Sequence, residues 1–329
     1  MNGAFVISLD FELHWGVRDQ FLVNGAYTAN LEGARTAVPK MLELFEKFDV
    51  AVTWATVGFL FARSKEELLS FYPNVRPNYT DKKYDPYREL LGNGEEDDPL
   101  HYAPSLLEQI KTTPKQEIGT HTFSHYYCLE AGQTAEAFRY DLLSAIAIAK
   151  IWDLEIHTII FPRNQVNPEY VKILLELGIT IYRDNEPSWF YSAAATDEHS
   201  LPKRAGRLID TYVPLTPHNL GEWEKIKQAN GLYNIPSSRF LRPYSPKLAG
   251  LESLRLHRIC QGITRAAKEN KIYHLWWHPH NFGIYQDENL AFLKKILGHV
   301  AKCREQYGLE SLTMQGVVER LENKKSSSQ

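Results

Sequence analysis

The stretch Glu117-Ile-Gly-Thr-His-Thr-Phe-Ser-His125 places two histidines four residues apart among small hydroxylated side chains. On a helix, residues i and i+4 point the same way, because about 3.6 residues complete one turn. His121 and His125 would then reach one metal ion, and zinc binds imidazole nitrogen at about 2.0–2.1 Å. Among 12 histidines such a pair also arises by chance, so its meaning depends on the rest of the chain.

The composition of the 329 residues, 43% hydrophobic and 23% charged, is that of an ordinary globular protein. A net charge of −3 gives no electrostatic reason to bind nucleic acid or an anionic membrane surface. The longest apolar run, residues 50–62, is too short and too interrupted to be a transmembrane segment. The N-terminus lacks a signal-peptide pattern and the three cysteines are widely spaced, so we expect a cytoplasmic protein with free thiols. The sequence does not indicate an oligomeric state.

Short apolar runs alternate with amphipathic segments, which is the pattern of an α/β protein built from βα repeats. We expect strands at residues 4–9, 50–55, 117–120, 156–161, 179–182, 272–277 and 311–314. We expect helices at residues 36–48, 134–152, 167–178, 249–270 and 289–303, and a frayed tail at 324–329. No internal repeat is apparent.

Two regions, at about residues 63–115 and 186–246, break this alternation with prolines, glycines and aromatic residues. We interpret them as insertions into a single catalytic domain that spans residues 1–329. The first insertion is rich in tyrosine and is either an ordered cover over a cleft or a solvated surface loop. Its tyrosines are Tyr72, Tyr79, Tyr84, Tyr87 and Tyr102.

Polar residues follow the predicted strands at their C-terminal ends. In a βα barrel these positions open onto one face, so residues far apart in the sequence meet there. Each residue alone has an ordinary structural explanation, such as a loop cap or a surface ion pair. Their shared position at strand ends favours one functional site, made of Asp10, Glu12, His121, His125, Arg163, Asp184 and His278.

The ordered motifs resemble those of the NodB-type polysaccharide deacetylases, carbohydrate esterase family 4. Glu117–His125 matches the E-I-G…H-[ST]-x-x-H motif, and Ala51–Gly58 is similar to the A-T-F-F-V-x-G strand that precedes it. Phe161–Gln165 resembles the arginine motif, and Leu275–His278 fits L-x-x-H. The resemblance implies a partly open or distorted (β/α) barrel of about seven strands.

The first motif departs from the family pattern. Ser8-Leu-Asp-Phe-Glu12 stands where many members have T-F-D-D, so Asp10 matches the catalytic base and Phe11 occupies the place of the metal-binding aspartate. Glu12 is the nearest replacement, as in the D-x-[DE] variant branch of the family. Arg163 also lacks the R-x-P-[YF] context that is usual in the arginine motif.

The resemblance implies a role for each of these residues. Glu12, His121 and His125 would bind a divalent metal, expected to be Zn²⁺, with a position left open for water. Asp10 would be the general base, and Arg163 would hold it ionised and oriented. His278 would be the general acid, and Asp184 would be an orienting carboxylate. His14 and His280 lie near enough in the sequence to compete for these roles.

We therefore expect a metal-dependent hydrolase that removes an N-acyl group, such as acetyl, from an amino-sugar substrate. That substrate would be a soluble or lipid-linked intermediate of surface polysaccharide biosynthesis, bound by aromatic residues that include Trp189, Trp223, Trp276 and Trp277. One alternative is a hydrolase of a small non-sugar amide, allantoinase-like and independent of metal. The other is a catalytically degenerate glycan-binding protein, which the loss of T-F-D-D favours.

Overall fold

Strand β1 (Ala4–Phe11) is buried along its whole length and divides its side chains between two cores. Its odd-numbered residues pack against the helices outside the sheet. Ala4 and Val6 belong to a second core within the curl of the sheet. Because side chains alternate along a strand, Ser8 and Asp10 continue this inner row. The inner face is therefore apolar where β1 begins and polar where it ends.

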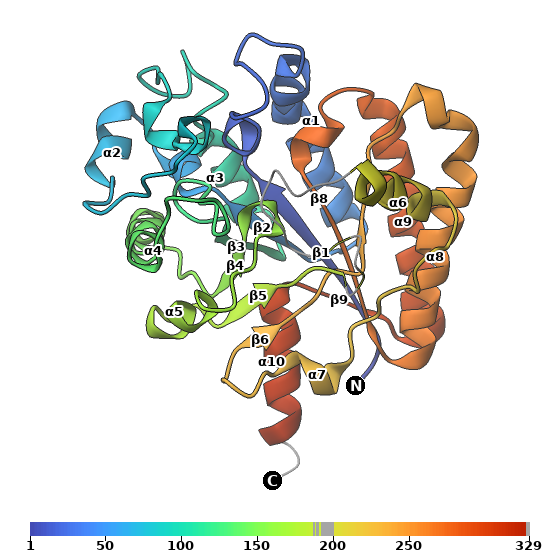
Figure 1. The fold of residues 1–329 in the computed structure, drawn as a ribbon. Coiled ribbons are helices and arrows are strands. Elements are labelled where there is room, and N and C mark those ends of the chain that lie inside the picture. The colour runs from blue at the N-terminus through green and yellow to red at the C-terminus, as the bar shows by residue number, and fades with distance from the viewer. Residues whose placement is uncertain (187, 189–190, 192–200, 327–329) are drawn as a thin grey trace.

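The strands pair in parallel around β1, in the order β6-β5-β4-β3-β2-β1-β8-β7, with helices outside the sheet (Figure 1). β9 (Glu310–Leu312) pairs with the first three residues of β1. The other strands are β2 (Val52–Thr56), β3 (Gln116–Thr120), β4 (Thr158–Ile160), β5 (Ile181–Arg183), β6 (Tyr233–Asn234), β7 (Arg239–Phe240) and β8 (Ile272–Trp277).

Strands β6 and β7 stand at opposite ends of this order, although only residues 235–238 separate them in the chain. A link of this length reaches at most roughly 18 Å, so the two ends of the sheet must lie close together. The link itself joins them, because Ile235 N donates to Tyr182 O at 2.9 Å and Ser238 N donates to His274 O at 2.8 Å. The sheet is therefore a distorted barrel, as predicted, in which β6 and β7 are the halves of one bent strand.

The computed structural model describes residues 1–186, 188, 191 and 201–326. Its helices are α1 (Thr28–Lys47), α2 (Lys65–Ser70), α3 (Pro104–Thr112), α4 (Ala135–Lys150), α5 (Val171–Glu176), α6 (Leu201–Tyr212), α7 (Trp223–Ile226), α8 (Glu252–Glu269), α9 (Gln286–Tyr307) and α10 (Met314–Ser326). α10 lies below the sheet in Figure 1, and its Met314, Val317 and Leu321 fill the inner core beside Ala4 and Val6. Within the described residues, no helix has both the length and the apolar character needed to cross a membrane.

Several predicted boundaries were wrong. Helix α1 begins at Thr28 and not at Thr36, the predicted start, which lies inside the helix and donates from its hydroxyl to Gly33 O. Both insertions contain helices that the interrupted patterns did not predict, although Pro104 occupies the first turn of α3, where proline is favoured. The tail expected to fray from Lys324 continues α10 to Ser326, and residues 327–329 lie outside the described part.

The tyrosine-rich insertion packs against the protein instead of forming a solvated surface loop. Tyr79, Tyr84 and Tyr102 are buried. The Tyr79 hydroxyl accepts a hydrogen bond from Tyr127 N at 2.9 Å, directly after the predicted metal-binding motif. The insertion therefore supports the loop that follows β3.

Two glycines allow helix α1 to approach the segment after β8. A Cβ atom on Gly33 would lie 1.9 Å from Gly283 O, and one on Gly283 would lie 1.9 Å from Asn30 O. Gly283 follows the short helix η8 (Pro279–Phe282), whose preceding residue is His278. This contact fixes the segment that carries the predicted general acid.

We predict that Gly33→Ala lowers the free energy of unfolding by about 1–3 kcal/mol, because the added methyl group collides with backbone atoms that cannot rotate away. Gly298→Ala in α9 is the matched control, since its Cβ would meet nothing closer than Phe48 Cε1 at 4.0 Å. We expect that control to be neutral or stabilising by up to about 1 kcal/mol. Urea unfolding of both variants measures the difference, and equal effects would contradict the proposed close contact.

Candidate active site

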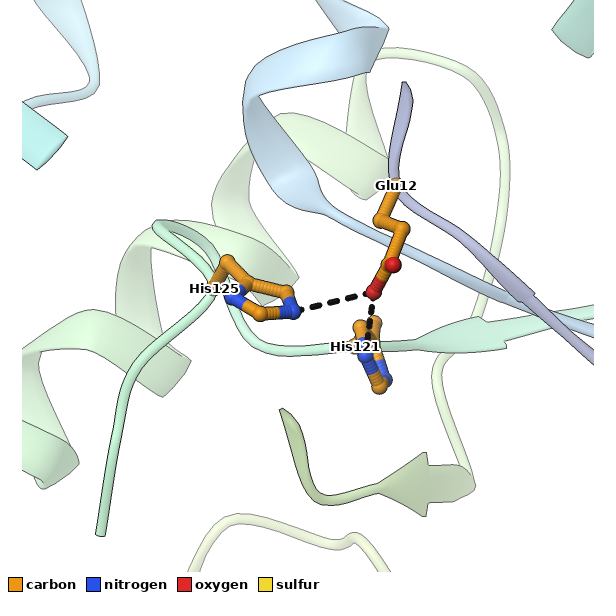
Figure 2. A group of neighbouring side chains, drawn as sticks. All are labelled: Glu12, His121 and His125. Atoms are coloured by element: carbon orange, nitrogen blue, oxygen red, sulfur yellow. Dashed lines mark hydrogen bonds and ion pairs between the residues drawn. The ribbon is translucent and has the colours of Figure 1, made fainter. Parts of the chain in front are cut away.

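Glu12, His121 and His125 converge at the C-terminal end of the barrel, as predicted (Figure 2). Glu12 Oε2 lies 3.3 Å from His121 Nε2 and 3.0 Å from His125 Nε2. Gly16 leaves room for the carboxylate, because a Cβ there would lie 2.0 Å from Glu12 Cδ. The longer side chain of glutamate thus reaches the two histidines from one residue beyond the usual aspartate position.

The hydrogen bonds of His121 fit a metal ligand. Its Nδ1 lies 2.9 Å from Ile160 O, so Nδ1 carries the ring proton and donates a hydrogen bond to the carbonyl oxygen. Nε2 then presents a lone pair, is buried and has no hydrogen-bond partner, although the Glu12 carboxylate faces it. A cation between these two atoms would bind both of them, and a backbone carbonyl behind the ring is typical of metal-binding histidines.

His125 is held differently. Its Nδ1 lies 3.5 Å from Arg18 Nη1, a hydrogen-bond donor, and its Nε2 lies 3.0 Å from the Glu12 carboxylate, so these contacts place the ring proton on Nε2, where a metal ion would replace it. Burial lowers the pKa of His125 to about 3, which leaves the ring neutral at physiological pH. Burial opposes ionisation of Glu12, but the surrounding histidines outweigh it and hold the pKa of that carboxyl well below its usual value. The group therefore offers two imidazoles and one carboxylate, a donor set that suits zinc.

The backbone that carries the two histidines is a loop and not the helix that their spacing suggested. Thr122 and His125 have positive φ angles of 63° and 56°, which is unusual for residues other than glycine. The buried carboxylate of Asp141 in α4 holds this loop by accepting hydrogen bonds from Phe123 N at 2.7 Å and from the backbone and hydroxyl of Ser124. The sequence contained a signal for this role, because Asp141 lies on the apolar face of the predicted helix.

Asp10 forms its ion pair with Arg183, whereas the sequence assigned that partner to Arg163. Both carboxylate oxygens of Asp10 accept from the guanidinium at 2.8 Å. Burial opposes ionisation of Asp10, but Arg183 outweighs it and holds the pKa of Asp10 below its usual value. Arg163 lies in a turn after β4 with a φ of 53° and pairs with Asp19 instead.

A chain of hydrogen bonds extends from this ion pair through two residues that the sequence analysis missed. Arg183 Nη1 donates to Ser8 Oγ at 2.9 Å, and Ser8 Oγ lies 2.8 Å from His274 Nε2. His274 Nδ1 lies 3.1 Å from Ile235 O and therefore carries the ring proton. Burial lowers the pKa of His274 to about 3, so the neutral ring accepts from the Ser8 hydroxyl. The chain links residues of β1, β5 and β8 across the interior of the barrel.

Asp184 does not contact Arg163 or His278, contrary to the role proposed for it. Its carboxylate accepts from Asn185 N at 2.7 Å and from Asn234 Nδ2 at 3.4 Å. The physical reason is alternation along β5, which turns residue 183 toward the barrel interior and residue 184 away from it. Strand parity in the sequence could have identified Arg183.

His278 lies between the two carboxylates. Its Nε2 is 3.8 Å from Asp10 Oδ2 and 3.7 Å from Glu12 Oε1, while its side chain stays 25% exposed. His280 stacks beneath it with ring centroids 5.1 Å apart and is buried. Burial lowers the pKa of His280 to about 3, so it serves as a neutral support. His278 is the histidine of this pair that a substrate can reach.

His14 lies outside this site. Its Nδ1 is 2.9 Å from His101 Nε2, and Nδ1 of His101 is 2.8 Å from the Asp98 carboxylate. The second nitrogen of His14 is 3.0 Å from Phe21 O. This buried chain connects the first insertion to the loop that carries Glu12.

A cavity of about 250 Å³ opens beside His278. Trp276 lines it, whereas Trp223 and Trp277 are core residues and Trp189 lies outside the described part. The insertion tyrosines are not among its lining residues.

Comparison of the sequence with protein-family models and with curated proteins finds no match. Several solved structures nevertheless share the fold. A Mycobacterium smegmatis protein classed with the polysaccharide deacetylases has a TM-score of 0.59 at 13% identity, covering 99% of this chain and 92% of that one. A Pseudomonas aeruginosa PAO1 protein of the same class has a TM-score of 0.53 at 10% identity, covering 96% and 89%. The α-amylase AmyC from Thermotoga maritima also reaches 0.53, at 12% identity, covering 97% and 75%.

The chain therefore has the barrel fold of the polysaccharide deacetylases, as its motifs predicted. An α-amylase shares that fold with the same TM-score as the Pseudomonas aeruginosa protein, so the fold does not determine the reaction. The choice depends on the side chains at the end of the barrel.

We predict that Asp141→Asn weakens zinc binding by about 10–100-fold, the range typical of residues that position metal ligands. The amide nitrogen would face the Ser124 N–H group, so the loop loses an acceptor at a cost of about 1–3 kcal/mol. Metal titration followed by competition with a chelator measures the affinity. Asp97→Asn is the matched control, because Asp97 also accepts from backbone N–H groups but lies in an exposed turn. Unchanged zinc affinity in Asp141→Asn would contradict the role of Asp141.

Proposed function

We propose that this protein is a metal-dependent hydrolase that removes an N-acyl group, acetyl in the simplest case, from an amino-sugar substrate. The observation that carries the proposal is the buried group of Glu12, His121 and His125, whose ligand atoms all lie within 4.8 Å of one another. This arrangement suits a divalent cation, and the adjoining Asp10 and His278 supply the two proton-transfer groups that amide hydrolysis needs. In this proposal one catalytic domain carries both insertions, and the substrate is an intermediate of surface polysaccharide biosynthesis.

The roles follow from the contacts of each residue. Asp10, held ionised by Arg183, takes a proton from the water that attacks the acyl carbon. A divalent cation held by Glu12, His121 and His125 would polarise the acyl oxygen and lower the pKa of that water. His278 gives a proton from Nε2 to the departing amine, which leaves poorly without one. The Ser8–His274 chain keeps Arg183 in place while Asp10 changes its charge.

The alternatives from the sequence predict different contacts. A metal-independent amidase does not need two imidazoles and a carboxylate within metal-binding distance of one another. A glycan-binding protein without activity has no use for a base held by a bidentate buried arginine, since such a pair costs desolvation energy that binding does not recover. Asp10→Asn distinguishes an enzyme from a binding protein, because it would lower turnover by about 10²–10⁴-fold and leave sugar binding intact.

We predict that chelation abolishes release of acetate from N-acetylated amino sugars and that added zinc restores it. His121→Ala and Glu12→Gln should each weaken zinc binding by at least about 100-fold, since ligands matter more than the residues behind them. The control is His157→Ala, a histidine whose side chain is 40% exposed and pairs with Glu155. Full activity in a sample shown by elemental analysis to contain no metal would overturn the metal mechanism.

We predict that Arg183→Gln moves the acidic limb of the kcat/KM profile to higher pH. Burial raises the pKa of Asp10 once the guanidinium no longer opposes it, so the base becomes protonated at a higher pH. Arg163→Gln is the control, because Arg163 pairs with Asp19 and should leave that limb unmoved. If Arg163→Gln alone moved this limb, Arg163 would be the functional partner of Asp10, as the sequence suggested.

A further inference from the structure

The cavity beside His278 has an unusual surplus of positive charge. Five arginines line it, and Glu186 is the only carboxyl group among the described lining residues. Glu186 Oε1 accepts a hydrogen bond from Trp276 Nε1 at 3.2 Å, and one carboxyl group cannot balance five guanidinium groups. The lining arginines are Arg163, Arg204, Arg207, Arg239 and Arg242.

Two of the five arginines are neutralised by acidic partners. Arg163 pairs with the buried carboxylate of Asp19. Arg239 lies 3.2 Å from Asp210 Oδ2, and the other oxygen of Asp210 already accepts from Arg258 at 2.8 Å. Asp210 is therefore saturated and cannot balance a further arginine of the cavity.

The other three arginines have no carboxylate partner among the residues that the structure describes. Arg242 donates from Nε to the Thr211 hydroxyl at 3.2 Å, which is a neutral acceptor. Arg204 and Arg207 lie three residues apart on α6 and so share one face of that helix. Burial and the neighbouring Arg204 lower the pKa of Arg207, whereas Tyr191 and Glu186 oppose that change without forming an ion pair with it.

Unbalanced guanidinium groups in a partly buried cavity are costly unless an anion binds there. Guanidinium forks suit phosphate, which carries about 1.5–2 negative charges and accepts paired hydrogen bonds. Two aromatic residues, Phe240 and Trp276, also line the cavity with ring centroids 4.7 Å apart, and aromatic faces suit a sugar ring. The volume of about 250 Å³ is small for a ligand pocket and favours one sugar unit over a chain of sugars.

We propose that this cavity binds a phosphate group attached to the amino-sugar substrate, with Arg204, Arg207 and Arg242 as the phosphate-binding residues. The proposal rests on the proposed function, because it places the sugar between the arginines and His278. It also specifies that function, since the substrate would be a sugar phosphate or a phosphate-linked precursor and not a neutral polysaccharide.

Calorimetric titration of the metal-free protein tests this without turnover. We expect N-acetylglucosamine 1-phosphate to bind at least about tenfold more tightly than N-acetylglucosamine, with a difference that shrinks as salt increases. Arg207→Gln and Arg242→Gln should each weaken binding of the phosphorylated sugar by about 10–100-fold and leave the neutral sugar unaffected. If either of these variants fails to fold, Arg204→Gln, at an exposed position on the same helix face as Arg207, should show the same loss of affinity for the phosphorylated sugar.

Arg139→Gln is the matched control, since Arg139 on α4 pairs with Glu176 and does not line the cavity. Equal affinity for the two sugars, or no effect of all three variants, would overturn the proposal. If N-acetylmuramic acid, a carboxylate-bearing sugar, bound more tightly than N-acetylglucosamine 1-phosphate, the arginines would form a carboxylate site and the phosphate proposal would be wrong. Binding of the sugar phosphate without acetate release would contradict only the hydrolase, whereas equal hydrolysis of both sugars would contradict only the phosphate site.

Discussion

The Asp10–Arg183 ion pair joins strands from opposite sides of the barrel and is almost completely buried. Such a pair is not kept for stability, because apolar residues of the same size often stabilise a core as well or better. Removing one partner, however, would leave an uncompensated buried charge at a cost of about 3–5 kcal/mol. The pair therefore constrains its surroundings: Ser8, Asn164 and Trp276 are all arranged around the guanidinium. The rest of the site is built outward from it.

Much of this arrangement could be predicted from residue order alone. Polar residues at the ends of apolar strands converge in any βα barrel, and Asp10, Glu12, His121, His125 and His278 do converge. The position of Glu12 was the least obvious of these, and it depends on a neighbouring glycine that no motif mentions. Placement in the D-x-[DE] branch of the family stays a prediction.

The choice among neighbouring residues could not be made in the same way. Arg163 follows its strand in a left-handed turn, and a motif-based assignment does not reveal where a side chain points from such a turn. Strand parity would have separated Arg183 from Asp184, but β5 is only three residues long and gives a weak pattern. Asp141 and His274 act through hydrogen bonds to segments distant in the sequence, and such partners become visible only in the folded chain.

The bent strand that closes the barrel separates two parts of the chain with different freedom to change. Residues 235–238 connect both edges of the sheet, so an added residue there would pull Tyr182 and His274 out of register. The segment between β5 and β6, which contains α6 and its arginines, has no such restriction on its length. Selectivity for a substrate can therefore diverge among related proteins through changes in one tolerant segment, while the acid, base and metal ligands stay fixed on the barrel.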